Sequence, residues 1–143
     1  MLSSRDMIRV VAAIIEDAGR VLICQRRGGP FALKWEFPGG KMRPSETPRA
    51  ALARELREEL AIEAQIGPEV FRVRHRYAEM SKGVEITFLA AKLQRATLPF
   101  STPRNLVFER IVWAERGELA RYDFLEADRL LIRGLSRGNL RFR

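Results

Sequence analysis

The segment spanning residues 47–60 predicts a helix in a chain whose other long apolar runs, up to residue 113, have the character of strands. Thr47 provides an N-cap, and Pro48 takes the first helical position, where a missing N–H costs nothing. Alanines and leucines then recur at helical spacing as far as Leu60. A long helix among strands predicts an α+β fold in which a mixed β-sheet is flanked by helices.

Six segments combine apolar and β-branched residues in the way that is typical of strands. These segments are residues 8–15, 20–27, 35–37, 71–77, 84–93 and 106–113. The turn Asp17-Ala18-Gly19 joins the first two, which predicts a hairpin, and Pro38-Gly39-Gly40 ends the third. We also expect a loop over 98–105, a short helical turn over 115–122 and a terminal helix over 126–136.

The length of 143 residues and the 46% hydrophobic content suit one domain, 1–143, with a single core. No stretch approaches the roughly 18 apolar residues of a transmembrane helix, and residues 1–10 lack the apolar centre of a signal peptide. A single cysteine, Cys24, and a single histidine, His75, exclude an internal disulfide and a metal site built from these residues. We therefore expect a cytoplasmic protein without a membrane partner.

The chain is basic, with 26 Lys and Arg against 18 Asp and Glu and a formal net charge of +8. Arginine dominates this excess. Such a balance favours a polyanionic partner, which includes nucleic acid, an acidic membrane surface and a phosphorylated small molecule. The alternative is a bias in composition that affects only a solvated surface.

Three carboxylates lie close together on the predicted helix. Glu55, Glu58 and Glu59 fall within an arc of roughly 100°, because each helical residue turns the chain by about that angle. Such a cluster suits a hard cation, and Mg²⁺ is the usual one where phosphates are also bound. Arg54, one turn before Glu58, is placed to hold that carboxylate. The alternative is an ordinary charged, solvated helix.

The spacing of these residues resembles the Nudix box, G-x5-E-x7-R-E-U-x-E-E-x-G-U, in which U is a bulky aliphatic residue. The matching residues are Gly40, Glu46, Arg54, Glu55, Leu56, Glu58, Glu59 and Ile62. Ala61 stands where the box has glycine, and alanine costs about 1 kcal/mol there if the position is left-handed. Residues 23–27, 34–41 and 124–128 look like the corresponding segments of MutT-type nucleoside triphosphate pyrophosphohydrolases.

The resemblance implies a Nudix-type α/β/α sandwich and hydrolysis that depends on Mg²⁺, with Mn²⁺ as a substitute. It implies that Arg54 and the three glutamates are catalytic, with one glutamate as a candidate base. The implied metal ligands are Glu55, Glu58, Glu59, the backbone at Gly39 or Gly40, and a more distant Glu109. The implied substrate contacts are Arg26, Glu36, Phe37 and Asp128.

Each of these outlying assignments has a plainer alternative. Glu109 is otherwise a surface charge, Arg26 a solvated strand end, and Asp128 an N-cap for the last helix. Phe37 fits a core position better than one that stacks on a base, and His75 fits a core position better than a catalytic one. Two arginine rows, 72/74/76 on a strand and 133/137/141 on the last helix, are either solvated surface or contacts for a polyanion.

The function that follows is the cleavage of a nucleoside triphosphate to monophosphate and pyrophosphate, with cleansing of the nucleotide pool as one use. A nucleoside-diphosphate sugar, a dinucleotide or capped RNA are alternative substrates. From another class, the chain would be a regulatory module that binds a nucleotide or RNA without hydrolysis. No RNA-recognition motif or aromatic platform supports a nucleic-acid partner. Monomer and homodimer both stay open.

Overall fold

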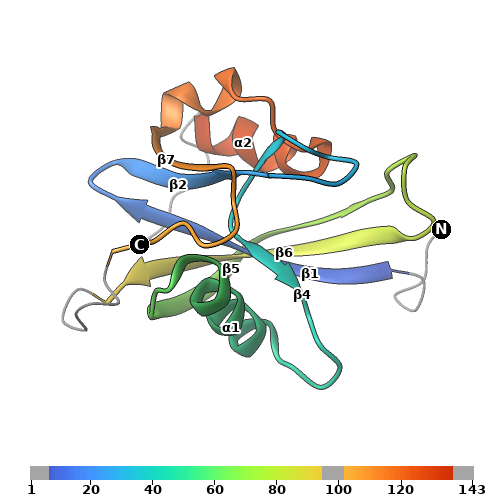
Figure 1. The fold of residues 1–143 in the computed structure, drawn as a ribbon, viewed down its shortest axis with the longest axis horizontal. Coiled ribbons are helices and arrows are strands. Elements are labelled where there is room, and N and C mark those ends of the chain that lie inside the picture. The colour runs from blue at the N-terminus through green and yellow to red at the C-terminus, as the bar shows by residue number, and fades with distance from the viewer. Residues whose placement is uncertain (1–6, 95–101, 137–143) are drawn as a thin grey trace.

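The computed structural model describes residues 7–94 and 102–136. Within them seven strands form one mixed sheet in the order β3-β2-β1-β6-β5, with β4 also paired to β1 and β7 to β2 (Figure 1). The strands are β1 (Met7–Asp17), β2 (Arg20–Gln25), β3 (Trp35–Glu36), β4 (Gly39–Lys41), β5 (Ala64–His75), β6 (Gly83–Leu93) and β7 (Arg110–Glu115). The helices are α1 (Pro48–Leu60), α2 (Arg129–Ser136) and the 3₁₀ helices η2 (Arg116–Arg121) and η3 (Glu126–Asp128).

Helix α1 begins and ends as local chemistry requires. The Thr47 hydroxyl accepts a hydrogen bond from the Ala50 N–H at 3.1 Å, and Pro48 follows at the first helical position. Beyond Leu60 the chain turns at Ala61, which is left-handed with φ 54° and ψ 38°. Its N–H donates to the Arg57 carbonyl at 3.1 Å. The expected strain at this alanine is therefore present.

The expected hairpin between β1 and β2 is confirmed. Asp17 pairs with Arg20, and the two residues between them, Ala18 and Gly19, both have positive φ, at 53° and 78°. This is the backbone of a type I′ turn, whose twist matches that of the flanking strands. Strand β1 then pairs in parallel with β6, and β6 pairs antiparallel with β5, so the sheet is mixed as predicted.

Helices cover both faces of the sheet, which confirms the α/β/α sandwich (Figure 1). On one face, Leu52 and Leu56 of α1 belong to a buried cluster with Val11 of β1. On the other face, Leu131 of α2 packs in a second cluster that includes Phe88 of β6. No helix within the described ranges is long and apolar enough to cross a membrane.

The strands differ most from the prediction at three places. Strand β5 starts at residue 64 instead of 71, because register shifts on either side of Glu69 accommodate the Gly67-Pro68 pair within the strand. Strand β7 starts at residue 110 instead of 106, because the Asn105 amide bonds both the N–H and the carbonyl of Phe108, at 2.7 and 2.8 Å, and closes a loop there.

The third difference is β4, which the sequence analysis treated as the end of an extended piece. Gly39 and Gly40 pair with Ala12 and Val11 of β1. A Cβ at Gly39 would lie 2.0 Å from the Val11 carbonyl oxygen, so only glycine allows this close approach. The pairing holds the two glycines against the centre of the sheet, where they meet the acidic residues of α1.

The smaller differences concern the helices. The terminal helix predicted over 126–136 consists of η3 followed by α2, and the turn predicted over 115–122 is η2.

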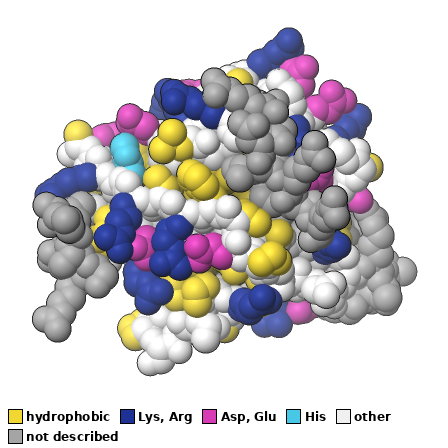
Figure 2. All heavy atoms as spheres, turned by 180° about the vertical axis from the view of Figure 1, so that it is seen from behind, with side chains coloured by type: hydrophobic (Ala, Val, Ile, Leu, Met, Phe, Trp, Pro, Cys, Tyr) yellow, Lys and Arg dark blue, Asp and Glu magenta, His cyan; other side chains and the backbone are white. Residues whose placement is uncertain are grey.

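Basic and acidic side chains are interspersed on one face of the molecule, as Figure 2 shows. On β5, Arg72 pairs with Glu69 at 2.6 Å and Arg74 with Glu85 at 2.8 Å.

Candidate functional site

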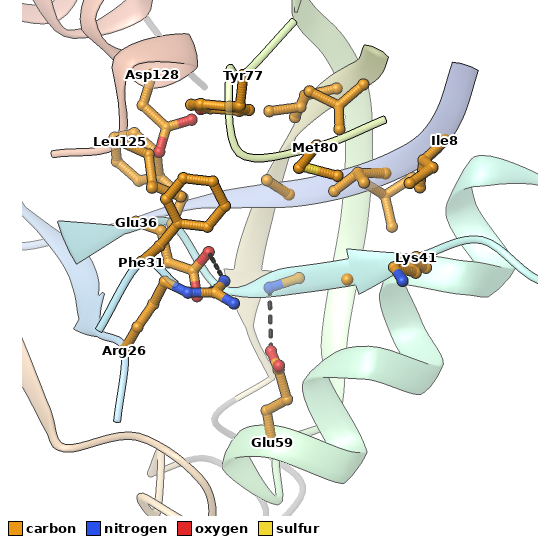
Figure 3. Close-up of a pocket in the computed structure, with 18 of the residues that line it drawn as sticks. Ile8, Arg26, Phe31, Glu36, Lys41, Glu59, Tyr77, Met80, Leu125 and Asp128 are labelled. Atoms are coloured by element: carbon orange, nitrogen blue, oxygen red, sulfur yellow. Dashed lines mark hydrogen bonds and ion pairs between the residues drawn. The ribbon is translucent and has the colours of Figure 1, made fainter. Parts of the chain in front are cut away.

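A cavity of about 430 Å³ is lined by residues of β1, β3, β4, β6, α1 and η3 and by the connections that follow β2, β3 and β5 and precede η3. Most of its lining side chains are apolar. Figure 3 shows that its charged groups lie at separate places, with Arg26 and Glu59 on one side and Asp128 on the other. The cavity therefore offers an apolar space with charged groups at both ends.

The predicted metal-binding glutamates of α1 meet the glycines of β4. The Gly39 N–H donates to the Glu59 carboxylate at 3.1 Å. The Glu55 carboxylate packs on Gly40, where a Cβ would lie 2.6 Å from it. Glu58 is more exposed, with half of its side-chain surface accessible. Two of the three predicted carboxylates thus converge on the backbone that the resemblance assigned to the metal.

Arg54 organises this group of acids. Its guanidinium donates two hydrogen bonds of 2.8 Å to Glu46, one of 2.8 Å to Glu55 and one of 3.3 Å to Glu58. It also donates to the Lys41 carbonyl at 3.1 Å. A forked pair of this kind fixes both partners more firmly than a single contact does. Arg54 therefore holds the acidic helix to the loop before it.

Glu46 matched the Nudix box, but the sequence analysis assigned it no role. Its bonds from Arg54 and from the Arg43 N–H lower its pKa to about 2. Glu46 is thus a charged anchor for Arg54 at neutral pH. Its spacing in the box was the signal that was available for this role.

The carboxylates near Glu59 repel one another. Burial, followed by the charges of Glu36 and Glu55, raises the pKa of Glu59 to about 9. A cation among these oxygens would relieve the repulsion, and an all-oxygen donor set is what hard divalent ions prefer. Within the described residues no three acidic, histidine or cysteine side chains are grouped so that they could hold a metal. Glu58 contacts Arg54 and Arg43. The oxygen atoms of Glu55, Glu59 and the adjacent backbone nevertheless suit a hard divalent cation.

Arg26 and Glu36, both predicted substrate contacts, form an ion pair at the cavity wall. The Arg26 Nη1 donates to the two Glu36 oxygens at 3.0 and 3.2 Å. Its Nε is buried without a hydrogen-bond partner. Glu36 is partly buried, with 20% of its side-chain surface exposed, and burial raises its pKa against the opposing effect of Arg26. Glu36 therefore orients the Arg26 guanidinium, and Arg26 keeps an unused donor.

Phe37 both packs in the core and lines the cavity. It is 3% exposed, and its ring lies 5.3 Å from that of Phe124 and 6.0 Å from that of Phe88. The core interpretation is thus correct, and the same ring also forms part of the cavity wall.

Asp128 lines the opposite side of the cavity, and it is only 3% exposed. Burial, aided by the charge of Glu36, raises its pKa well above the usual range of an aspartate. Its carboxyl group makes no hydrogen bond to any described residue. The helix-cap alternative lacks the bond that it requires, whereas a free carboxyl group is available to a bound molecule.

Glu109 lies away from this group. It precedes β7, its N–H donates to the Gln25 carbonyl at 2.9 Å, and its half-exposed side chain lies 3.7 Å from the Arg27 guanidinium. It does not line the cavity. The sequence analysis placed Glu109 in a strand over 106–113, whereas β7 begins at Arg110, and its role as a ligand stays a prediction.

The remaining sequence candidates lie outside the cavity. Arg76 donates to the Ser81 carbonyl, as Arg72 and Arg74 pair with acids, so this row is a surface network. In the second row Arg133 is exposed, and positions 137 and 141 lie outside the described residues. His75 is partly buried, with its ring 4.4 Å from that of Tyr77 and its Nε2 3.6 Å from Glu126.

Several residues that line the cavity were not predicted as site residues, among them three from connections between strands. Phe31, Tyr77 and Met80 come from the connections after β2 and β5. Tyr77 falls within the strand predicted over 71–77, but β5 ends at His75, and nothing in the sequence indicates which apolar residue faces a cavity. Only the tertiary arrangement of the two connections brings them together.

Comparison with known proteins matches a family model described as NUDIX domain to residues 6–135. The CTP pyrophosphohydrolase of Escherichia coli is 57% identical over 65 residues, which cover 45% of this chain and 48% of that protein. The "Putative 8-oxo-dGTP diphosphatase 2" of Mycobacterium tuberculosis is 38% identical over 90% of this chain and 87% of its own. The solution structure of the E. coli ORF135 protein superposes with a TM-score of 0.77 at 33% identity, over 93% of this chain and 91% of that one.

Proposed function

This chain belongs to the NUDIX family of pyrophosphohydrolases, and on that premise we propose that it hydrolyses a nucleoside triphosphate to the monophosphate and pyrophosphate with Mg²⁺. The observation that carries the proposal is the position of Glu55 and Glu59 against Gly40 and Gly39 at the edge of the cavity. The names of the relatives refer to CTP and to 8-oxo-dGTP, both nucleoside triphosphates.

In this proposal Glu55, Glu58 and Glu59 hold the ion together with the backbone at Gly39 or Gly40. The ion would neutralise charge on the phosphates and activate the attacking water, and Mn²⁺ is the alternative metal. Of this set, Glu58 must give up its contacts with Arg43 and Arg54. Because those contacts are exposed and 3.3 Å or longer, the change costs little.

The chain's own residues supply position and charge around the reacting phosphate. Arg54 keeps Glu55 in place through its bond to Glu46 on the other side. Arg26 faces the cavity with a free Nε donor, so it suits a phosphate oxygen of the bound nucleotide. Preorganised donors of this kind act on charge that develops in the transition state.

Asp128 is the group that suits the base. A carboxyl group in an apolar space can accept from the amino or imino N–H of a base, and it can also donate while it is protonated. Burial raises the pKa of Asp128, which favours the protonated form. The surrounding rings of Phe31, Phe37 and Tyr77 provide flat apolar surface for the base.

The test is turnover on a nucleotide panel with Mg²⁺, Mn²⁺ or EDTA. The panel contains the ribo- and deoxynucleoside triphosphates, 8-oxo-dGTP, a nucleoside-diphosphate sugar and a dinucleotide, and released pyrophosphate and phosphate are measured separately. We expect pyrophosphate release only with metal and only from triphosphates. Preferred cleavage of the sugar or the dinucleotide would move the function to another member of the same class.

Replacement of a carboxylate tests the metal assignment. We expect Glu59→Gln to lower kcat/KM by about 100-fold, since a neutral amide is a poor ligand for a hard cation. Glu63→Gln is the matched control, because Glu63 pairs with Arg57 and does not line the cavity. If Glu59→Gln keeps activity within about tenfold of the unchanged protein, the metal assignment is wrong, and absence of turnover on every nucleotide would refute the enzymatic function.

A further inference from the structure

Tyr77 links three segments that are distant in sequence. Its ring lies 4.9 Å from that of Phe31 in the connection after β2, and 4.4 Å from the imidazole of His75 at the end of β5. Its hydroxyl accepts a buried hydrogen bond of 3.0 Å from the Ala127 N–H of η3. Tyr77 is 9% exposed, and Figure 3 shows it beside the cavity at the side where Asp128 lies.

The backbone around Asp128 determines where its carboxyl group lies, since that group makes no hydrogen bond to a described residue. The Asp128 N–H donates to the Leu125 carbonyl at 3.0 Å, and the Leu125 N–H donates to the Trp35 carbonyl at 3.0 Å. Both contacts are between backbone atoms. The bond from Ala127 to Tyr77 is the anchor that a side chain supplies, and it ties η3 to the connection after β5.

We propose that Tyr77 is a positioning residue for base selection, which acts through Asp128. Its hydroxyl fixes the Ala127 N–H and thereby the direction in which the next residue, Asp128, presents its carboxyl group. Its ring holds Phe31 at the cavity wall. This inference rests on the proposed function, in which Asp128 contacts the base.

Loss of the Tyr77 hydroxyl should weaken base discrimination and leave the acidic cluster in place. Removal of the hydroxyl leaves a buried N–H without a partner, which costs more than a hydrogen bond between exposed groups. Because η3 is only three residues long, we expect it to shift or open locally. A base held through the Asp128 carboxyl is then bound with less discrimination, whereas the acidic cluster around Glu59 lies on the other side of the cavity.

The test uses Tyr77→Phe, which keeps the ring and removes only the hydroxyl. Tyr122→Phe is the matched control, because Tyr122 packs on Trp35 at 4.9 Å and does not line the cavity. Amide hydrogen exchange at Ala127 should accelerate about tenfold in Tyr77→Phe and stay unchanged in the control. Unchanged exchange at Ala127 would overturn the proposed anchor.

Base selection is measured as the ratio of Kd values for α,β-methylene analogues of CTP and dGTP with Mg²⁺, and as the ratio of kcat/KM for the two natural nucleotides. We expect Tyr77→Phe to move both ratios about fivefold toward unity, mainly through KM. Asp128→Ala should move the ratios in the same direction, and Tyr77→Phe should add nothing further in that background. Ratios equal to those of the unchanged protein, or full additivity with Asp128→Ala, would refute the positioning role.

The proposed function and the role of Tyr77 can be refuted separately. If the unchanged protein neither binds nor hydrolyses any nucleotide, the proposed function is wrong and the role in base selection is refuted with it. If it turns nucleotides over with Mg²⁺ and only the ratios are insensitive to Tyr77→Phe, the proposed function stands and the role of Tyr77 is refuted alone.

Discussion

The left-handed backbone of Ala61, at the end of α1, allows the effect of Ala61→Gly on the free energy of unfolding to be predicted. Ala61 has φ 54° and ψ 38°, a conformation in which a Cβ crowds the neighbouring backbone. Glycine removes that crowding and keeps the bond from the residue 61 N–H to the Arg57 carbonyl. After the entropy that glycine loses on folding is included, we expect Ala61→Gly to raise the free energy of unfolding by about 1 kcal/mol. For a domain of this size the same change raises Tm by about 3 °C.

The assay is urea denaturation followed by far-ultraviolet circular dichroism, with the m-value checked for constancy so that the change reflects stability alone. Ala53→Gly is the matched control, because Ala53 lies inside α1 in the right-handed region. The same alanine-to-glycine change should there lower the free energy of unfolding by about 1 kcal/mol. Opposite signs at the two positions are the expected result. If Ala61→Gly also destabilises, the reasoning from backbone conformation is refuted.

Two further predictions follow from the charges and the core. The bonded carboxylate of Glu46 has a pKa of about 2, below its ordinary value of 4.5, so its contribution to stability is full above pH 4.5 and is lost as the pH falls toward 2. The stability difference between the unchanged protein and Glu46→Gln, measured by urea denaturation, should therefore shrink over that interval, and a difference that is constant with pH would contradict the pairing with Arg54. Cys24 is fully buried, and burial raises the pKa of its thiol, so a thiol reagent at pH 8 should label it only after guanidinium unfolds the chain. Rapid labelling of the folded protein would show that β2 opens readily.

Helix α1 and its acidic residues could be predicted because the information is local. The cap, the proline and the apolar spacing lie within one segment, and residues three or four apart on a helix share a face whatever the rest of the chain does. The hairpin turn at residues 17–20 is equally local. The strained backbone at Ala61 followed from the same pattern, since a helix that stops where glycine is usual ends in a left-handed residue.

The other half of the site depends on contacts between distant segments. Tyr77 meets Ala127 across 50 residues, and Arg27 reaches the Phe108 carbonyl across 81. No periodicity encodes such pairs. Glu109 illustrates the consequence, because its assignment depended on a strand boundary that the Asn105 side chain moves. Strand β4 was not predicted for a related reason, because glycine has a low strand propensity. Gly39 and Gly40 pair with β1 here because the two backbones approach closely.

The net charge of +8 indicated a polyanionic partner, yet two arginines near the cavity form ion pairs with acidic residues of the same chain. Arg26 pairs with Glu36 and Arg54 with Glu46. At the cavity the acids of α1 would repel a polyphosphate, because carboxylates and phosphates carry charge of the same sign. In the proposed function a divalent ion would reverse this relation, since the carboxylates would hold it and it would attract the phosphates. We therefore expect the basic surface to contribute attraction at long range, and the acidic cluster to make close approach conditional on metal.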